Sequence, residues 1–282
     1  MPGTLFVVAT PIGNLEDITA RALRVLREVA VIAAEDTRRT GHLLAKFAIT
    51  TPTTSLHEHN ERSKSQALIT RLLEGQSIAL VSDAGTPTVS DPGLRLIQNA
   101  IAAGIRVEPV PGPSAIMAAL SASGIAGETF VFLGFPPTRA KDRKIWFDDL
   151  ATAARTVVFF EAPHRIRATL KDLLNKLGDR TIVIGRELTK VHEELVRSHI
   201  SDLIARFEQP VGEFTIVVDC GQIPERVEPK ATDSESIATE FGELTERRGF
   251  SRREAAAEIA RRHGLATNTV YSMMESLKKS GD

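Results

Sequence analysis

The sequence has a single cysteine and no long apolar run. Only Cys220 carries a thiol among 282 residues, so no disulfide can form within the chain, as is typical of proteins of the reducing cytosol. No apolar stretch approaches the roughly 18 residues of a membrane span. The first residues lead directly into a strand-like run, without the basic segment and apolar core of a signal peptide. These absences predict a cytoplasmic protein with no part in the membrane.

Aromatic residues and net charge are also scarce. Aromatics make up 5% of the chain, with one Trp and one Tyr, which argues against an extended platform for base stacking. The formal net charge is -1, so a nucleic-acid partner would be held by local basic patches.

Three common cofactor motifs are missing as well. Neither Gly-x-Gly-x-x-Gly nor Gly-x-x-x-x-Gly-Lys-Ser/Thr occurs, which argues against a dinucleotide-dependent dehydrogenase and against a phosphate-binding-loop NTPase. The segment His57-Glu58-His59 has no third ligand at a usual spacing, and His-Glu-x-x-His is absent. We therefore expect no metal site.

What the sequence does contain is a series of short apolar runs that alternate with amphipathic segments. This alternation is typical of βαβ units on a parallel sheet, and it predicts an α/β fold. Strands are expected at 5–9, 29–34, 78–81, 107–110, 130–133, 156–160, 181–184 and 215–218.

Changes in composition divide the chain further. We predict an N-terminal α/β lobe at 1–113, a second α/β lobe at 114–221, a linker at 222–236 and a C-terminal module at 237–282. Within the module, Ser251 and Glu254 have the spacing of a capping box, and a second helix is expected after Thr267. This pattern indicates a helix-turn-helix module.

Small residues and prolines gather where predicted strands end, which is where open α/β sheets bind their ligands. The loops are Thr10 to Leu15, Glu35 to Arg39, Ser82 to Gly93, Pro111 to Ala115 and Glu161 to Arg165. Such residues let backbone groups approach a ligand closely while the loop stays rigid, as an adenosine pocket requires. Any one of these loops taken alone is more often a tight turn between a strand and a helix, and it is their concentration at one edge that favours a ligand site.

Two charged runs have open interpretations. Glu35 and Asp36 follow a strand and precede two arginines, so they could act in catalysis or complement a helix dipole. Glu187, Lys190, Glu193 and Glu194 recur at helical spacing, which predicts the solvated face of a helix.

Six motifs in order resemble one family, the ribosomal RNA small subunit methyltransferase I group of the tetrapyrrole methylase superfamily. They are Val8 to Ile18, Ala34 to Arg38, Ser82 to Pro87, Pro111 to Ala115, Glu161 to Arg165 and Arg186 to Lys190. The resemblance runs from about residue 4 to 219, and the C-terminal helices resemble the module that this group often carries. Related tetrapyrrole methylases have Gly-x-Gly-Pro-Gly where this chain has Thr10 to Asn14, which argues against a porphyrin-like substrate.

The resemblance implies a two-lobed tetrapyrrole-methylase-like fold and a reaction. The reaction is 2'-O-methylation of a cytidine in the decoding region of 16S rRNA, with S-adenosylmethionine as donor, the 30S subunit or its RNA as partner and a homodimer as the working form. Carried over by position, the donor would contact Pro11, Ile12, Ala84, Gly85, Thr86, Val89, Ser114, Ala115, Glu161, Ala162 and Leu188. Glu35, or failing it Asp36, would receive the proton of the ribose hydroxyl.

Phosphates of the RNA would be held by basic residues near the mouth of this cleft. The candidates are Arg38, Arg39, Arg139, Lys141, Arg143, Lys144, His164 and Arg165, with the pairs at 247–248, 252–253 and 261–262 in the C-terminal module. Two other functions stay open: a relative acting on a tetrapyrrole or a protein side chain, and a non-catalytic regulator that binds nucleic acid through its C-terminal helices.

Overall fold

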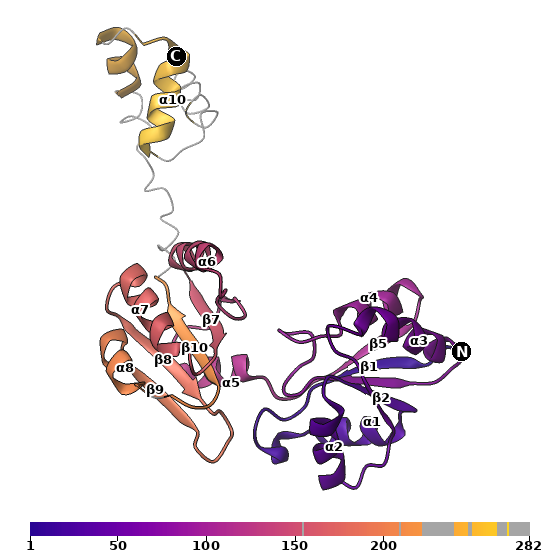
Figure 1. Cartoon of the computed structure of the whole chain (residues 1–282). Helices are drawn as coiled ribbons and strands as arrows, with labels where there is room; N and C mark the ends of the chain where they lie inside the picture. Colours follow the sequence, from indigo (N-terminus) through magenta and orange to yellow (C-terminus); the bar gives the residue numbers. More distant parts are fainter. Residues whose placement is uncertain (154, 209, 222–239, 248–249, 264–269, 271–282) are drawn as a thin grey trace. The chain divides into compact units, whose positions relative to one another are not determined.

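The computed structural model describes residues 1–153, 155–208, 210–221, 240–247, 250–263 and 270. Contacts within the chain divide it into two units, Met1–Gln222 and Ile223–Asp282. The first unit holds two five-stranded sheets (Figure 1). No helix among the described residues is long and apolar enough to cross a membrane.

The first sheet is parallel throughout, as the alternation of strands and helices predicts. Its strands lie in the order β3-β2-β4-β1-β5. Their bounds are β1 Thr4–Val8, β2 Val31–Ala34, β3 Thr53–Ser55, β4 Ile78–Val81 and β5 Arg106–Val110. Strands β2 and β4 are buried along their whole length, because helices cover both faces of the sheet.

Four helices form these two covering layers (Figure 1). One face packs against α1 (Ala20–Glu28) and α2 (Thr37–Lys46), and the other against α3 (Glu61–Leu73) and α4 (Leu94–Ala102). The short helix η1 (Leu15–Asp17) precedes α1. Because the strands are parallel, the loops after β1, β2 and β4 all lie at the carboxyl edge of the sheet, which the helices do not cover.

The second sheet is mixed, and here the prediction of a parallel sheet is wrong. Its order is β6-β7-β10-β8-β9, and β6 with β7 is the one parallel pair of neighbours among these strands, the other three pairs being antiparallel. The bounds are β6 Phe130–Phe132, β7 Thr156–Glu161, β8 Thr181–Arg186, β9 Glu194–His199 and β10 Phe214–Asp219. Strands that are buried on both faces read as continuous apolar runs in either direction, so the sequence pattern does not report their orientation.

Helices again cover both faces of this second sheet. Helices α6 (Ala140–Thr152), α7 (Ile166–Leu177) and α8 (Ile200–Arg206) pack on one face. Helix α5 (Ala115–Ser123) packs on the other through Ile116, Ala119 and Leu120. The chain therefore passes from the first sheet to the second between the end of β5 and the start of α5.

The charged run at 187–194 is a turn that leads into β9, so the predicted helix is wrong. Glu187 and Thr189 have φ of +50° and +66°, which a right-handed helix does not allow. Strand β9 lies at the edge of the sheet and pairs only with β8 among the described strands. Edge strands carry charged residues that prevent further pairing, and this explains the polar sequence.

In the second unit the predicted capping box is confirmed. The Ser251 N–H donates to Glu254 Oε2 at 2.9 Å, and the Glu254 N–H donates to Ser251 Oγ at 3.3 Å. Helix α10 (Arg252–His263) follows this cap, and a π-helical turn, η2 (Glu243–Arg247), precedes it. Ala256, Ile259 and Ala260 share a buried cluster with Val270. The predicted linker and, apart from Val270, the predicted second helix lie outside the described residues.

Candidate active site

The loops that follow β1 and β4 are joined by backbone hydrogen bonds. The Thr10 N–H donates to the Gly85 carbonyl at 2.8 Å, and the Gly85 N–H donates back to the Thr10 carbonyl at 2.9 Å. Gly85 has φ of +79°, a conformation that favours glycine. Because β1 and β4 are neighbours, the two loops form one rigid wall at the carboxyl edge of the first sheet.

Against this wall lies a cavity of about 380 Å³, which we call the main cavity. Small-molecule sites have volumes of roughly 300–1,000 Å³, so it is large enough for such a ligand. Nine of the eleven residues expected to contact the donor line it: Ile12, Ala84, Gly85, Thr86, Val89, Ser114, Ala115, Glu161 and Ala162. The other lining residues were not predicted as donor contacts, and they are Ser90, Asp91, Ile116, Phe135, Phe160, Pro163, Glu213, Phe214 and Thr215.

Two phenylalanines among the missed residues form an aromatic part of the lining. The ring centroids of Phe135 and Phe160 are 5.5 Å apart, and Phe135 is half exposed. An exposed ring beside a cavity is available for contact with a flat ligand group. Neither residue belongs to a strand-end motif, so the sequence held no signal for this role.

The remaining two predicted contacts lie elsewhere. Pro11 lines a second cavity of about 130 Å³, the small cavity, together with Thr10, Leu15, Arg39, Thr40, His42, Leu43, Ser82 and Asp83. Leu188 packs with the buried cluster between α5 and the second sheet. Residues adjacent in sequence line different cavities. Pro11 and Asp83 line the small cavity, whereas Ile12 and Ala84 line the main cavity. The cavities therefore share a wall.

Glu161, which lines the main cavity, is engaged by other groups of the protein. Its side chain is 0% exposed, and its Oε1 accepts a hydrogen bond from the Ala162 N–H at 2.8 Å and pairs with Arg165 Nε at 3.3 Å. Its Oε2 accepts from the Thr169 hydroxyl and lies 3.9 Å from Arg143. The carboxylate has the partners that a buried charge needs, and it fixes the loop after β7.

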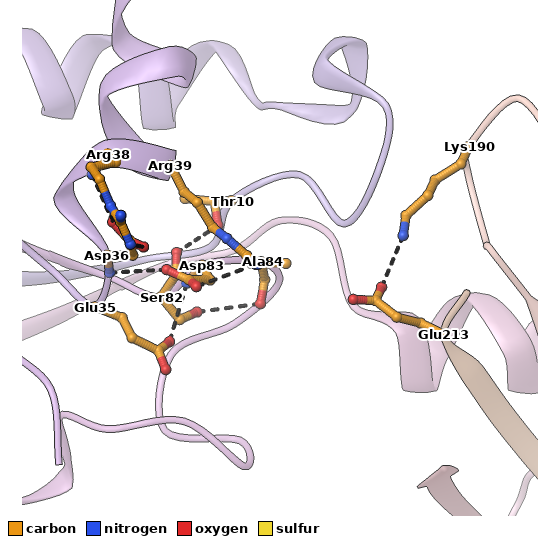
Figure 2. A network of polar contacts seen from close by, with 10 residues as sticks. All are labelled: Thr10, Glu35, Asp36, Arg38, Arg39, Ser82, Asp83, Ala84, Lys190 and Glu213. Carbon is orange, nitrogen blue, oxygen red and sulfur yellow. Dashed lines mark hydrogen bonds and ion pairs between the residues drawn. The ribbon is translucent and has the colours of Figure 1, made fainter. Parts of the chain in front are cut away.

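Beside the shared wall, carboxylates from the loops after β2 and β4 lie close together (Figure 2). Asp83 Oδ1 accepts from the Asp36 N–H at 3.0 Å, and the Asp83 N–H donates to Glu35 Oε2 at 3.3 Å. Arg39 pairs with Asp83 at 3.3 Å. Burial raises the pKa of the Glu35 carboxyl above its usual range, against a hydrogen bond from Asp83 that lowers it. Glu35 itself lines neither of the two cavities.

Asp36 has the structural role that the sequence left open. Its side chain accepts from the Arg38 N–H at 2.8 Å and so caps α2, and it pairs with the Arg38 guanidinium at 2.8 Å. Hydrogen bonds from Arg38 lower the pKa of the Asp36 carboxyl to about 2. A carboxylate with so low a pKa is a weak base at neutral pH.

Asp91 is an acidic residue of the loop after β4 for which the sequence predicted no role. It lines the main cavity, eight residues beyond Asp83. Burial raises the pKa of its carboxyl to about 6, the Ser82 hydroxyl lowers it, and the charges of Glu35 and Asp83 raise it further. Its neighbours Thr88 and Ser90 have φ of +71° and +69°, which is rare outside glycine and recurs at functional sites.

The loop after β1 also contacts the turn before β9. The Asn14 N–H donates to Thr189 Oγ1 at 2.9 Å. A Cβ on Gly13 would lie 2.9 Å from the Leu188 carbonyl oxygen and 2.5 Å from Lys190 Cγ, so only glycine fits there. Lys190 Nζ in turn pairs with Glu187 at 2.8 Å. It also pairs with Glu213 at 3.1 Å (Figure 2). These contacts connect the loop after β1 to the second sheet.

The basic candidates for RNA divide into exposed and engaged side chains. Arg38 and Arg39 are 88% and 67% exposed despite their acidic partners. Arg139, Lys141, Lys144 and His164 are exposed too. Arg165 is largely buried against Glu161 and donates to the Pro136 carbonyl, and Arg143 pairs with Asp172 at 2.8 Å. The guanidinium groups of Arg143 and Arg165 are thus bound by other groups of the protein, in contrast to the exposed candidates.

The histidines of the segment 57–59 do not form a metal site in the part of the chain that the structure describes. There, no group of three His, Cys, Asp or Glu side chains could hold a metal ion. His57 Nε2 lies 3.0 Å from the Asn60 side-chain nitrogen, and the two rings of His57 and His59 meet edge to face. These contacts indicate a local structural role for the segment.

Comparison with known proteins gives one consistent family. The sequence profile of the family Tetrapyrrole (Corrin/Porphyrin) Methylases matches residues 4–204. The chain is 44% identical over 282 residues to a protein of Synechocystis sp. named ribosomal RNA small subunit methyltransferase I, covering 99% of this chain and 100% of that protein. A protein of the same name from Thermotoga maritima is 48% identical over 218 residues, which are 77% of this chain and 98% of that protein.

Among solved structures, the fold matches that of a uroporphyrin-III C-methyl transferase from Thermus thermophilus complexed with S-adenyl homocysteine. The TM-score is 0.55 at 19% identity, covering 77% of this chain and 98% of that one. At that level of identity the match supports the fold.

Proposed function

We propose, because the chain belongs to the ribosomal RNA small subunit methyltransferase I family, that it transfers a methyl group from S-adenosylmethionine to RNA of the small ribosomal subunit. The observation that carries this proposal is the main cavity. Residues from four separate segments of the chain, each of which resembles a motif of this family, line it together. A substrate of this kind would be met in the cytoplasm.

The lining of the main cavity suits a donor with an adenosine part. The wall formed by Ala84, Gly85 and Thr86 lets a ligand approach the backbone closely, because two of these residues have little or no side chain. Ile12, Val89 and Phe135 add apolar surface for an adenine ring. Ser114 lies at the N-terminus of α5, where its hydroxyl already accepts from the Met117 N–H at 3.5 Å. We propose this cavity as the donor site.

Pro11 and Leu188 then support the donor site from outside. Pro11 lines the small cavity and precedes Ile12, which lines the main cavity, and Leu188 lies within the turn that meets Gly13. Substituting either residue would move a wall of the donor site rather than remove a contact. We therefore propose an indirect role for both.

For the acceptor, we propose the 2'-hydroxyl of a cytidine in the decoding region of 16S rRNA, as the family resemblance implies. The small cavity supports this because it adjoins the donor site and has Arg39 and His42 at its rim. Arg38, Arg139, Lys144 and His164 are exposed and could contact phosphates. For Arg165 we propose instead that it holds Glu161. A homodimer as the working form is a further part of this proposal.

Methyl transfer needs positioning first and a proton acceptor second. The ribose oxygen must lie about 3 Å from the methyl carbon, in line with the leaving sulfur, and this geometry supplies much of the rate. Of the two carboxylates predicted to act in catalysis, we propose that Asp36 caps α2 and that Glu35 acts on the site through its neighbours. Neither residue lines the two cavities.

The test is transfer of labelled methyl from S-adenosylmethionine to three acceptors: small ribosomal subunits from cells lacking the protein, a uroporphyrinogen, and protein extract. We expect label in the RNA of the small subunits alone. Label in the tetrapyrrole or in protein would give the chain another acceptor within the superfamily. A chain that binds RNA but not the donor would be a regulator without catalytic activity.

A further inference from the structure

We propose that the Asp91 carboxylate is the catalytic residue that takes the proton of the acceptor hydroxyl during methyl transfer. This inference rests on the proposed function and adds to it the group that completes the reaction. It concerns a residue that belongs to none of the predicted catalytic or donor-binding positions.

Asp91 differs from the other acidic residues of the main cavity. Three acidic side chains line this cavity, Asp91, Glu161 and Glu213. Glu161 is held by Arg165 at 3.3 Å, and Glu213 pairs with Lys190 at 3.1 Å. Asp91 has no ion pair with a Lys, Arg or His within the described part of the chain. Among the three acidic groups of the cavity, Asp91 is therefore the one that no cation of the described residues neutralises, and the hydrogen bond from Ser82 leaves further acceptor positions of its carboxylate to a ligand.

The position of Asp91 also meets what a proton acceptor needs. Asp91 lines the main cavity and lies close enough to Ser82 and Asp83, which line the small cavity, for their groups to act on it. A donor in the main cavity and a ribose in the small cavity would meet at the shared wall beside this carboxylate. A general base must lie within hydrogen-bond reach of the proton that it removes.

The charged groups around Asp91 keep its carboxyl ready to bind a proton. Glu35 faces it from the loop after β2 and Asp83 from the loop after β4, while Arg39 on α2 partly neutralises Asp83. Glu61 on α3 is engaged by the Gly93 and Arg95 N–H groups, at 3.1 and 2.8 Å. Burial is the largest cause of the raised pKa of Asp91, about 6, and this lies near the pH at which a general base works best.

The step balances without a further reactant. The ribose oxygen attacks the donor methyl, an O–C bond forms, and the C–S bond breaks with its electron pair passing to the sulfonium sulfur. The O–H proton passes to an Asp91 oxygen and is released to water after the products leave. Glu35 is a positioning residue in this scheme, since its charge raises the proton affinity of Asp91.

The experiment measures single-turnover methyl transfer from S-adenosylmethionine to small ribosomal subunits between pH 5 and pH 9, with the full chain. Wild-type transfer should rise with pH through a midpoint near that of Asp91, about 6, and then level off. Asp91→Asn should lower the rate of methyl transfer by about 100-fold or more and abolish the pH dependence with a midpoint near 6. Its affinity for the donor, measured by calorimetry, should stay within about threefold of the wild-type value. Glu35→Gln should keep most of the rate and lower the midpoint, because a negative charge near Asp91 is gone.

The matched control is Glu28→Gln, which changes an exposed carboxylate of α1 and should leave rate and midpoint unaltered. An Asp91→Asn enzyme with wild-type rate and midpoint would overturn the inference. An Asp91→Asn enzyme whose donor affinity falls by the same factor as its rate would also overturn the inference, because Asp91 would then be a contact of the donor. A wild type that binds the donor but labels no RNA would contradict the proposed function itself, and the inference with it.

Discussion

At the scale of single residues, Glu161 is a residue of a family motif whose contacts indicate a structural role in the site rather than a catalytic one. Its carboxylate is fully buried and surrounded by Arg143, Arg165 and Thr169. The sequence could predict that it lies at the cavity, because it ends a buried strand. Its partners could not be predicted, since Arg143 and Thr169 come from helices whose packing no local pattern encodes.

Replacing Glu161 with Gln should destabilise the fold. The change keeps the shape but leaves the Arg165 guanidinium without its buried counter-charge, while Arg143 keeps Asp172, and we expect a loss of about 3 kcal/mol in the free energy of unfolding. Urea unfolding measures this. Glu28→Gln removes an exposed i,i+4 partner of Arg24 and should change the value by less than about 0.5 kcal/mol. Equal effects for both variants would contradict the buried ion pair.

Asp91→Asn should stabilise the protein in a pH-dependent way. In the folded state the pKa of Asp91 is raised to about 6 from 3.8, so folding is favoured while the group is protonated. This stabilisation is present below the unfolded pKa and is lost as pH rises through the folded pKa. The variant should therefore be about as stable as wild type near pH 4. Its stability relative to wild type should increase up to about pH 6 and stay constant at higher pH. Thermal unfolding at pH 4 and pH 8 tests this. A variant that is more stable than wild type at pH 4 but not at pH 8 would contradict a raised pKa of Asp91.

At the scale of elements, the loops of the first sheet were predictable and the second sheet was only partly so. The strand-end loops combine Gly, Pro and small residues after buried runs, and parallel strands bring such loops to one edge. Strand β9 was missed because its edge position makes it polar, and β3 because it has only three residues. Asp91 was missed because it lies in the long loop after β4, where sequence gives no measure of distance to the cavity.

The contact between the loop after β1 and the turn before β9 gives a prediction at this scale. Gly13→Ala should destabilise the protein by about 1–3 kcal/mol, because the new methyl would press on the Leu188 carbonyl and the Lys190 side chain. Donor affinity should fall as well, since Ile12 lines the cavity next to it. Calorimetric denaturation and donor titration measure the two effects.

Gly41→Ala is the matched control for this change. Gly41 lies inside α2, and a Cβ there would meet nothing within 4 Å. The substitution should stabilise the helix by about 0.5–1 kcal/mol without a change in donor affinity. If Gly13→Ala behaved like Gly41→Ala, the close approach of the two loops would be refuted.

At the scale of the whole molecule, the two units divide the work in our proposal. All residues that line the two cavities belong to Met1–Gln222. The relative from Thermotoga maritima is covered over 98% of its length by 77% of this chain. The sequence predicted the capped helix of the second unit correctly, because a capping box is a local signal.

A chain that ends at Gln222 should therefore bind S-adenosylmethionine with unchanged affinity. Its affinity for RNA of the small subunit should fall, and the dependence on salt should become shallower, because fewer basic residues would contact phosphates. Donor calorimetry and RNA titrations at two salt concentrations measure both. Loss of donor binding on truncation would show that the second unit takes part in the donor site.

Nucleoside analysis of small-subunit RNA, after incubation with the chain and labelled S-adenosylmethionine, tests the proposed reaction most directly. We expect label in 2'-O-methylcytidine. We expect no label when the main cavity is blocked by a Gly85→Val substitution, since a side chain is strained at φ of +79° and its Cβ would lie 3.5 Å from Ile12 Cγ2. Label in a methylated base, or full activity of the Gly85→Val enzyme, would contradict these expectations.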